Sequence, residues 1–153
     1  MKVKTSSKNS SGDNCVFCKI IFEKSPATFI YRDPLCSAFL DIQPVNPGHA
    51  LVIPNKHATY LADLDPDDGA HMFRIGQRIA AALRKSGIRC EGINLFLADG
   101  KAAMQEIFHV HLHIIPRYSG DGFGLKFAPS YYQKPDRAEL EEIGQKLRAV
   151  MKN

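Results

Sequence analysis

The most regular pattern along the chain is an alternation of histidine and aliphatic residues that begins at His109. His109, His111 and His113 are separated by single aliphatic residues, and the segment continues to Arg117. A period of two is that of a β-strand, so residues 109–117 are predicted to form a strand with three imidazoles on one face. At a rise of about 3.3 Å per residue, neighbouring histidines on that face have Cα atoms about 6.5 Å apart. This spacing allows them to bind one small group together.

Apolar runs bounded by turn residues predict four shorter strands in the rest of the chain. Asp33 and Pro34 mark a turn between the first two strands, and Pro44, Pro47 and Gly48 break the chain before the third. The predicted strands span residues 28–31, 37–41, 49–53 and 92–98.

Helical spacing predicts one long helix and a second helix near residue 150. The long helix begins at Pro66 with Asp65 as its N-cap, and Gly87 ends it. A long loop, residues 118–134, precedes the second helix, whose N-cap is Asp136. The apolar residues predicted to form the buried side of this second helix are Leu140, Ile143, Leu147 and Met151.

Composition and charge narrow the class of protein. The 153 residues are 44% hydrophobic and 24% charged, which fits one globular domain, predicted here for residues 14–153. No apolar run approaches the ~20 residues that a membrane helix needs. Residues 1–13 lack the apolar core of a signal peptide, so we expect a disordered leader, a cytoplasmic protein and no membrane partner. The net charge of +4 is too mild to predict nucleic-acid binding, and it suits an anionic small substrate.

The residues alone leave open what the histidine face does. A solvated strand face carries lysine, glutamate, threonine or serine more often than three imidazoles, and a purification tag would be contiguous and terminal. Imidazole serves both as a ligand for a transition metal and as a catalytic group. The pattern therefore predicts a functional site, with catalysis and metal binding as alternatives.

Two of the four cysteines form a Cys15-x-x-Cys18 pair. A redox pair of this spacing normally follows a strand, and nothing before Cys15 is strand-like. The same spacing supplies half of a zinc site, which needs two more ligands from elsewhere in the chain. Cys36 and Cys90 have no motif around them and are predicted to be small buried residues.

The chain over about residues 14–118 resembles the histidine triad family of nucleotide hydrolases and transferases. The resemblance is carried by His-Val-His-Leu-His-Ile-Ile-Pro-Arg at residues 109–117 and by further blocks in the family's order. Those blocks are residues 15–21, 39–42, 47–54 and 56–57. The resemblance implies an α+β fold with an antiparallel sheet of about five strands, one long helix and a C-terminal helix.

The resemblance also implies roles for three histidines. His111 matches the nucleophile, which attacks the α-phosphate and forms a nucleotidyl-histidine intermediate. His113 matches the histidine that hydrogen-bonds phosphate oxygens near the leaving group, and His49 matches a further histidine that packs against the site. Neutral imidazole is a good nucleophile, and a covalent intermediate divides one displacement into two easier steps. The implied reaction releases a nucleoside monophosphate, with AMP expected, from a phosphoramidate or a dinucleoside polyphosphate.

A purine nucleotide is the substrate that the resemblance implies. Asp41 matches the ribose-binding acid, although a carboxylate at a strand end can also be a plain loop residue. Gln105 and Glu106 match positions that line the phosphate pocket. The animal phosphoramidase branch has serine in place of Glu106 and asparagine in place of Ala98. Relative to that branch, this chain is expected to lack two hydrogen bonds to the phosphate and to gain a negative charge near it. Four residues match the apolar base slot, with core packing as the alternative: Phe17, Ile20, Phe39 and Ile42.

For the cysteine pair, the resemblance supplies His57 and His109 as the two missing ligands. Cys15, Cys18, His57 and His109 would form a closed Cys₂His₂ site, the pattern of a structural zinc with no open coordination position. Two free thiols and a surface His57 are the alternative.

The resemblance further implies a homodimer that extends the sheet. One alternative to hydrolysis is nucleotidyl transfer to another phosphate, and His113 argues against it because relatives that transfer often have a different residue there. A second alternative is a nucleotide-binding or interaction protein with little turnover, which the set of His49, His111 and His113 disfavours.

Overall fold

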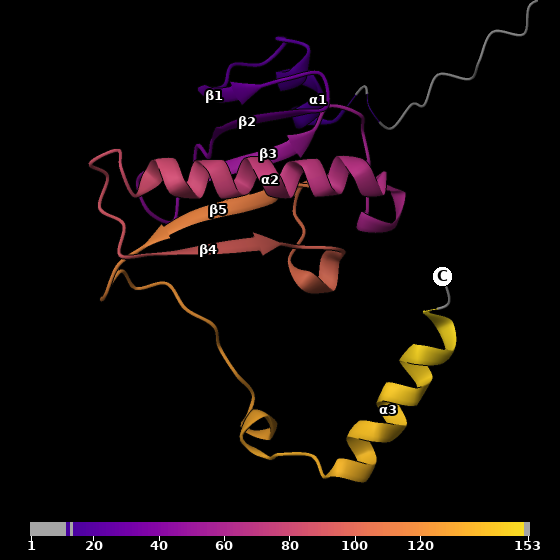
Figure 1. The fold of residues 1–153 in the computed structure, drawn as a ribbon. Coiled ribbons are helices and arrows are strands. Elements are labelled where there is room, and N and C mark those ends of the chain that lie inside the picture. Colours follow the sequence, from indigo (N-terminus) through magenta and orange to yellow (C-terminus); the bar gives the residue numbers. More distant parts are fainter. Residues whose placement is uncertain (1–11, 13, 152–153) are drawn as a thin grey trace, which may run out of the picture. The chain divides into compact units, whose positions relative to one another are not determined.

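The computed structural model describes residue 12 and residues 14–151 (Figure 1). By their internal contacts these residues form two units, one ending at Asp121 and the other beginning at Gly122. A division by internal contacts does not test how many domains the chain has, so a single domain over residues 14–153 stays a prediction. The predicted leader, residues 1–13, lies outside the described residues apart from Gly12, and its disorder also stays a prediction.

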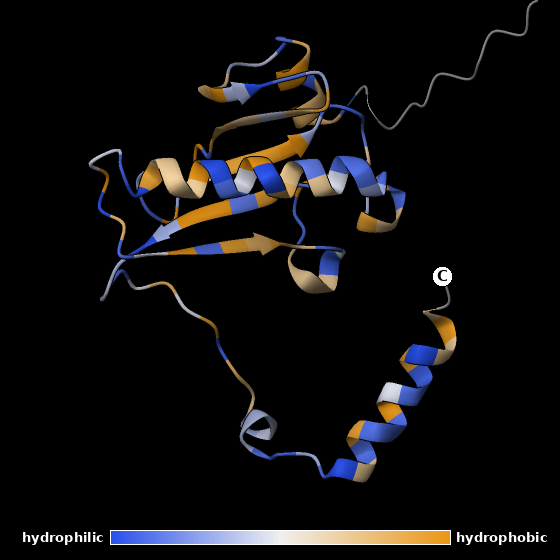
Figure 2. Cartoon of the chain, viewed as in Figure 1, coloured by the Kyte–Doolittle hydropathy of each residue, from blue (hydrophilic) through white to orange (hydrophobic). Residues whose placement is uncertain are grey.

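The first unit is built on one sheet of five strands in the order β1-β2-β3-β5-β4. Every neighbouring pair is antiparallel, which confirms the predicted α+β class with its antiparallel sheet. The strands are β1 (Phe29–Arg32), β2 (Cys36–Leu40), β3 (Ala50–Pro54), β4 (Gly92–Leu97) and β5 (Leu112–Arg117). The inner strands β3 and β5 are largely hydrophobic (Figure 2), as strands covered on both faces must be.

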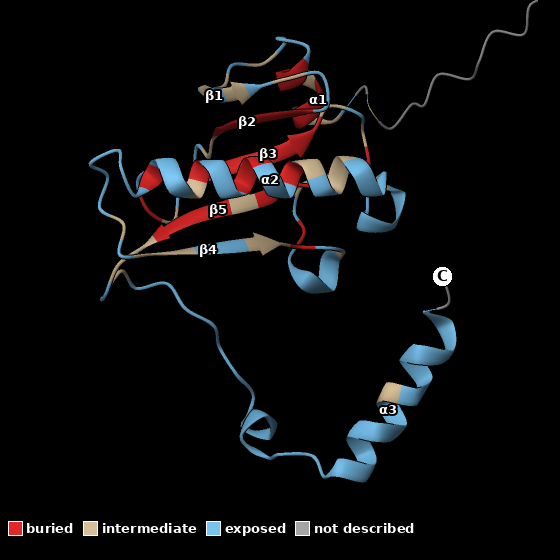
Figure 3. Cartoon of the chain, in the orientation of Figure 1, coloured by how far each residue is buried: buried red, intermediate tan, exposed pale blue. Residues whose placement is uncertain are grey.

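Helix α2 (Pro66–Leu83) lies against one face of this sheet (Figure 1). The Asp65 carboxylate accepts a hydrogen bond from the backbone N–H of Asp67, which confirms the predicted N-cap. The buried side of α2 packs on β2, β3 and β5 (Figure 3). This cluster includes Met72, Ile75, Ile79 and Leu83 of the helix and Cys36, Ala38, Ala50, Val52, Leu112 and Ile114 of the strands.

The short helix α1 (Val16–Ile21) packs on the opposite face. Strand β3 shows this directly, because Ala50 and Val52 belong to the cluster under α2 whereas Leu51 and Ile53 belong to the cluster under α1. The α1 cluster is completed by Phe17, Ile20, Ile21 and Phe39.

The alternation of the histidine segment is present, but the strand begins later than predicted. β5 starts at Leu112, and the N–H of Val110 donates to the carbonyl of Ala58 at 2.8 Å instead of to a neighbouring strand. The last pair between β3 and β5 joins Val52 to Leu112, and Pro54, two positions further along β3, has no N–H to offer. Val110 and Leu112 nevertheless lie in the core under α2, so the histidines that alternate with them point to the α1 face.

The second unit contains a 3-10 turn (Pro129–Tyr132) and helix α3 (Arg137–Val150). The Asp136 carboxylate accepts a hydrogen bond from the N–H of Glu139 at 2.8 Å, so the predicted N-cap is confirmed. The predicted burial of its apolar side is not met, because no described residue of α3 is buried (Figure 3). A unit this short cannot surround a helix with a core of its own. None of the described helices is long and apolar enough to span a bilayer.

Two glycines with left-handed backbone conformations test how the loop before β3 packs. Gly48 has φ +92°, and an added Cβ would lie 2.9 Å from a methyl carbon of Leu83, whereas Gly87 has φ +81° and nothing within 4 Å. Backbone strain alone costs roughly 1–2 kcal/mol. We expect Gly87→Ala to lower the free energy of unfolding by about 1 kcal/mol and Gly48→Ala by about 2–4 kcal/mol. Urea unfolding measures both, and equal losses would contradict the close approach of this loop to α2.

Candidate functional site

Two imidazole rings form the centre of the candidate site on the α1 face of the sheet. The ring centroids of His111 and His113 are 4.8 Å apart, and the ring of Phe17 from α1 lies edge-on 5.2 Å from that of His111. His111 is buried, and burial lowers its pKa below the usual value for histidine. The site is therefore walled by α1 and holds its histidines neutral at pH 7.

The orientation of His111 follows from its hydrogen-bond partner. Its Nδ1 lies 2.7 Å from the backbone carbonyl oxygen of His109. A carbonyl oxygen only accepts, so Nδ1 carries the hydrogen and donates it. In the neutral ring, Nε2 then bears the lone pair that a nucleophile needs.

His49 comes from the loop before β3 and has the opposite tautomer. The backbone N–H of Val45 donates to its Nδ1 at 3.1 Å, and a backbone N–H only donates. Burial lowers the pKa of His49, so the ring is neutral and its hydrogen lies on Nε2. That nitrogen is 2.9 Å from Nδ1 of His113 and 3.7 Å from a carboxylate oxygen of Asp41.

The tautomer of His113 follows from that of His49. Because the Nε2–H of His49 donates to Nδ1 of His113, the hydrogen of neutral His113 lies on its Nε2. Burial and the neighbouring rings lower the pKa of His113 to about 4. Adjacent rings on one strand face thus present opposite groups, a lone pair on His111 and an N–H on His113. This pair can attack a phosphorus atom and donate to an oxygen bound to it.

The predicted nucleotide contacts divide between the core and the surface. Asp41 lies beside His49, and its other carboxylate oxygen accepts a hydrogen bond from the N–H of Gln43 at 2.9 Å. Ile42 is almost fully exposed, at 95%. The other three base-slot residues, Phe17, Ile20 and Phe39, are buried in the α1 cluster. Core packing accounts for these three, and a role for any of them in binding a base stays a prediction.

Gln105 and Glu106 have different surroundings in the loop before the histidines. The Gln105 amide is buried, accepts a hydrogen bond from the N–H of Gly100 and donates to the carbonyl of Thr59, each at 2.8 Å. It therefore closes this loop onto the segment after β3. Glu106 is exposed, and its charge acts to raise the pKa of His111, against the larger effect of burial. A direct contact of either residue with a phosphate stays a prediction.

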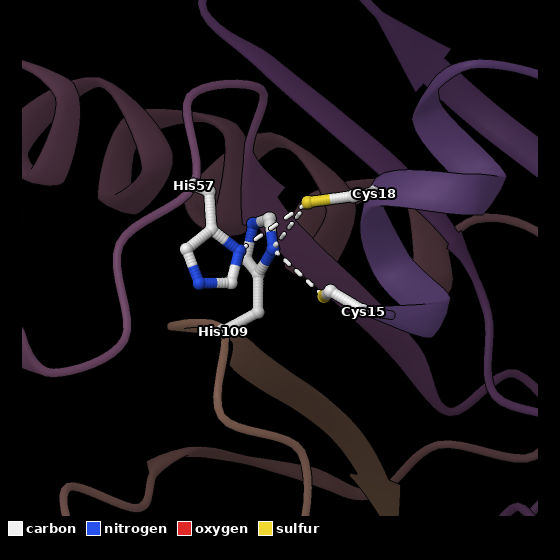
Figure 4. Close-up of side chains that lie close together, drawn as sticks. All are labelled: Cys15, Cys18, His57 and His109. Atoms are coloured by element: carbon white, nitrogen blue, oxygen red, sulfur yellow. Dashed lines mark hydrogen bonds between the residues drawn. The ribbon is translucent and has the colours of Figure 1, made fainter. Parts of the chain in front are cut away.

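The four residues predicted to bind zinc lie together (Figure 4). Their candidate ligand atoms are all within 4.8 Å of one another. The Nδ1 atoms of His109 and His57 lie 3.4 Å from the Sγ of Cys15 and 3.3 Å from that of Cys18, respectively. Zinc bound tetrahedrally at standard bond lengths separates sulfur and nitrogen ligands by roughly 3.5 Å. The donor set and its spacing therefore fit a zinc ion.

The groups around this cluster also suit a metal site. Nε2 of His109 lies 2.8 Å from the carbonyl oxygen of Pro54, and Nε2 of His57 lies 3.3 Å from the hydroxyl oxygen of Thr59. Such partners leave Nδ1 of each ring free to bind a metal. Burial raises the pKa of the Cys18 thiol to about 12, so metal binding would have to displace its proton.

The domain model of the HIT family matches residues 23–120. This chain belongs to the HIT family. The match confirms the family resemblance read from the sequence, and the Cys15-x-x-Cys18 pair precedes the matched segment.

A crystal structure and two named relatives extend this finding. A zinc-bound histidine triad family protein from Mycobacterium smegmatis is 44% identical with a TM-score of 0.71, covering 90% of this chain and 93% of that one. The adenosine 5′-monophosphoramidase hnt1 of Schizosaccharomyces pombe is 33% identical over 91% of this chain and 99% of its own length. The adenylylsulfatase HINT3 of Arabidopsis thaliana is 38% identical over 79% of this chain and 66% of its own length. The names of the two enzymes support nucleotide hydrolysis at the level of the family.

Sequence reasoning missed the residue that orients His49. The donor is the backbone N–H of Val45, and a backbone group carries no mark in the sequence apart from the absence of proline at that position. It also missed Asn46, a buried polar residue of the same loop, because one asparagine in a turn-rich segment predicts only a turn.

The lowered pKa of His113 predicts a loss of stability in acid. Its pKa is about 4 in the folded chain and 6.5 as a free side chain, so the unfolded chain binds the proton more tightly. The stability that comes from the neutral ring is present above about pH 6.5 and is lost as the pH falls toward 4. Urea unfolding across this window should show a smaller loss for His113→Gln than for the wild type. Equal losses in the two proteins would contradict a neutral, half-buried His113.

Proposed function

We propose that this chain is a nucleotide hydrolase that releases a nucleoside monophosphate through a covalent intermediate on His111. The proposal is carried by the hydrogen bonds of the two rings, which assign a lone pair to Nε2 of His111 and an N–H to Nε2 of the adjacent His113. A nucleophile and a hydrogen-bond donor held side by side are what displacement at phosphorus needs.

In the first step, Nε2 of His111 forms a bond to the α-phosphorus, and the leaving group departs with the electron pair of the broken bond. The Nε2–H of His113 donates to a phosphate oxygen near the leaving group. In the second step, water attacks the same phosphorus, the phosphorus–nitrogen bond breaks, and its electron pair returns to His111. The water proton passes to solvent, and the nucleoside monophosphate leaves.

The proposed substrate is a purine nucleotide, with AMP as the product. We infer that Asp41 accepts hydrogen bonds from a ribose, and the position of its carboxylate beside His49 supports this role. The exposed side chain of Ile42 follows it and offers an apolar surface to a base. The names of two relatives point to adenosine compounds with different leaving groups, an amine and a sulfate.

Two other activities fit less well. Nucleotidyl transfer requires a second phosphate to replace water, and the intact His113 favours hydrolysis. A binding protein with little turnover would not need the two rings to be held with opposite tautomers. Glu106 places a negative charge near His111 whichever substrate binds. This charge therefore does not distinguish phosphoramidates from dinucleoside polyphosphates, and both remain candidate substrates.

The test of this activity is AMP release from adenosine phosphoramidate and diadenosine tetraphosphate. We expect His111→Ala to lower the rate by at least about 10³-fold, because the covalent nucleophile is removed. His71→Ala is the matched control, since His71 hydrogen-bonds Asp33 and lies outside the site. If the wild type binds AMP but releases no AMP from either substrate, the catalytic proposal is wrong. The ratio of the two rates identifies the preferred leaving group.

The chain is also proposed to bind one structural zinc ion through Cys15, Cys18, His57 and His109. This is supported by the spacing of the four ligand atoms and by the zinc-bound relative from Mycobacterium smegmatis. A zinc ion would join α1 to the segment just before β5, and its charge would favour the thiolate form of both cysteines.

Replacing one cysteine tests the zinc proposal. We expect Cys15→Ser to lower zinc affinity by roughly 100-fold or more, since even the loss of an outer partner typically costs 10- to 100-fold. Cys90→Ser is the control, because Cys90 is a free cysteine outside the cluster. Elemental analysis of purified protein gives the zinc content of each. Equal zinc in wild type and Cys15→Ser would contradict the proposed ligand set.

Two further features stay predictions. A homodimer that extends the sheet would use β4, which is an edge strand with Leu95 exposed on it. An edge strand leaves backbone groups that a second strand can pair with. The cytoplasmic location also stays a prediction.

A further inference from the structure

Behind the histidine site lies a buried polar network centred on Asn46. The Asn46 side chain is only 5% exposed, and its Nδ2 donates to the carbonyl oxygen of Pro116 and to a carboxylate oxygen of Asp121, each at 2.8 Å. Neither acceptor can donate, so the orientation of the amide is unambiguous. Asn46 therefore ties the loop before β3 to the end of β5.

The far side of this network is held by an ion pair. The Asp121 side chain is 3% exposed, and its two oxygens accept hydrogen bonds from the Nε and Nη2 atoms of Arg117 at 2.6 and 2.8 Å. A carboxylate held by a two-point contact with arginine has little freedom to move. Asn46 is thus bound to a rigid acceptor and to the strand that carries His113.

The same short loop orients His49. The carbonyl oxygen of Asn46 accepts a hydrogen bond from the N–H of His49 at 3.0 Å, and the N–H of Val45 donates to Nδ1 of its ring. Val45 precedes Asn46 directly, so an anchor on Asn46 also places the Val45 N–H. The buried amide and the imidazole are two ends of one turn.

We propose that Asn46 is a positioning residue that sets the tautomer of His49, and through it the hydrogen that His113 presents to the substrate. The part about substrate rests on the proposed function, whereas the part about tautomers does not. If Val45 moves away, His49 loses the donor that keeps Nδ1 unprotonated. His49 can then carry its hydrogen on Nδ1 and present a lone pair to His113. His113 must in that case donate from its own Nδ1, which leaves its Nε2 without a hydrogen for the phosphate.

A plain structural brace would have a different effect. Asn55 is such a brace, because its Nδ2 donates to the carbonyl of Asp33 at 2.7 Å and its Oδ1 accepts from the hydroxyl of Ser37 at 2.7 Å. None of these three residues contacts the ring of His49. Asn55→Ala therefore removes a similar amide without touching the tautomers, and it serves as the matched control.

The test is a long-range ¹H–¹⁵N correlation spectrum of the histidine rings in the full chain, with AMP release measured in parallel. The wild type should show an unprotonated Nδ1 and a protonated Nε2 on His49. Asn46→Ala should show a mixture of the two tautomers, with kcat lowered by about 10- to 100-fold and KM nearly unchanged. Asn55→Ala should resemble the wild type in both measurements.

Several outcomes would overturn the proposal. One is a folded Asn46→Ala protein whose His49 signals match the wild type, and another is an equal change in Asn55→Ala. If Asn46→Ala does not fold, Asn46→Ser keeps one hydroxyl donor and should show a smaller shift of the same kind, and its absence overturns the proposal. If the tautomers shift in Asn46→Ala while the wild type itself releases no AMP, the positioning role holds and the proposed hydrolase function fails.

Discussion

The hydrogen bond from Nδ1 of His111 to the carbonyl oxygen of His109 is the interaction on which the rest of the site depends. It determines which nitrogen of His111 carries the hydrogen and which carries the lone pair. The backbone of His109 is in turn held by its own ring, which lies against the Pro54 carbonyl and against the thiols of Cys15 and Cys18. His109 thus joins the cluster of Cys15 and Cys18 to the ring of His111, which lies two residues further along the chain.

Burial gives these rings their chemical character. The alternation that puts Val110, Leu112 and Ile114 under α2 puts the histidines on the α1 face, where His109 and His111 are buried and His113 is half-buried. Removing water disfavours the charged imidazole, so the pKa values of His49, His111 and His113 fall and all three rings are neutral at pH 7. A neutral imidazole has one nitrogen with a lone pair and one N–H that can donate. The hydrogen-bond partners of the ring determine which nitrogen carries the hydrogen.

The tautomers of His111 and His49 are determined by backbone groups that can only accept or only donate a hydrogen bond. A carbonyl oxygen faces His111 and a backbone N–H faces His49, so each tautomer is enforced by the main chain. The carbonyl belongs to the histidine segment itself. The N–H belongs to a loop, which needs an anchor of its own, and the buried contacts of Asn46 with Pro116 and Asp121 supply one. The orientation of His49 thus depends on buried contacts that lie outside the three histidine rings.

The sequence by itself determined the strand pattern, the α2 and α3 N-caps and the two-sided character of the histidine segment, because each depends on neighbours a few residues apart. The cluster of Cys15, Cys18, His57 and His109 was predicted only through the family resemblance, since Cys15 and His109 are 94 positions apart. Only the tertiary structure decided that β5 begins at Leu112, that Gln105 closes a loop, and that Val45 and Asn46 orient His49. These features depend on backbone groups and on distant partners, such as Asn46 and Asp121 at a separation of 75 residues. Residue types along the sequence do not predict such contacts.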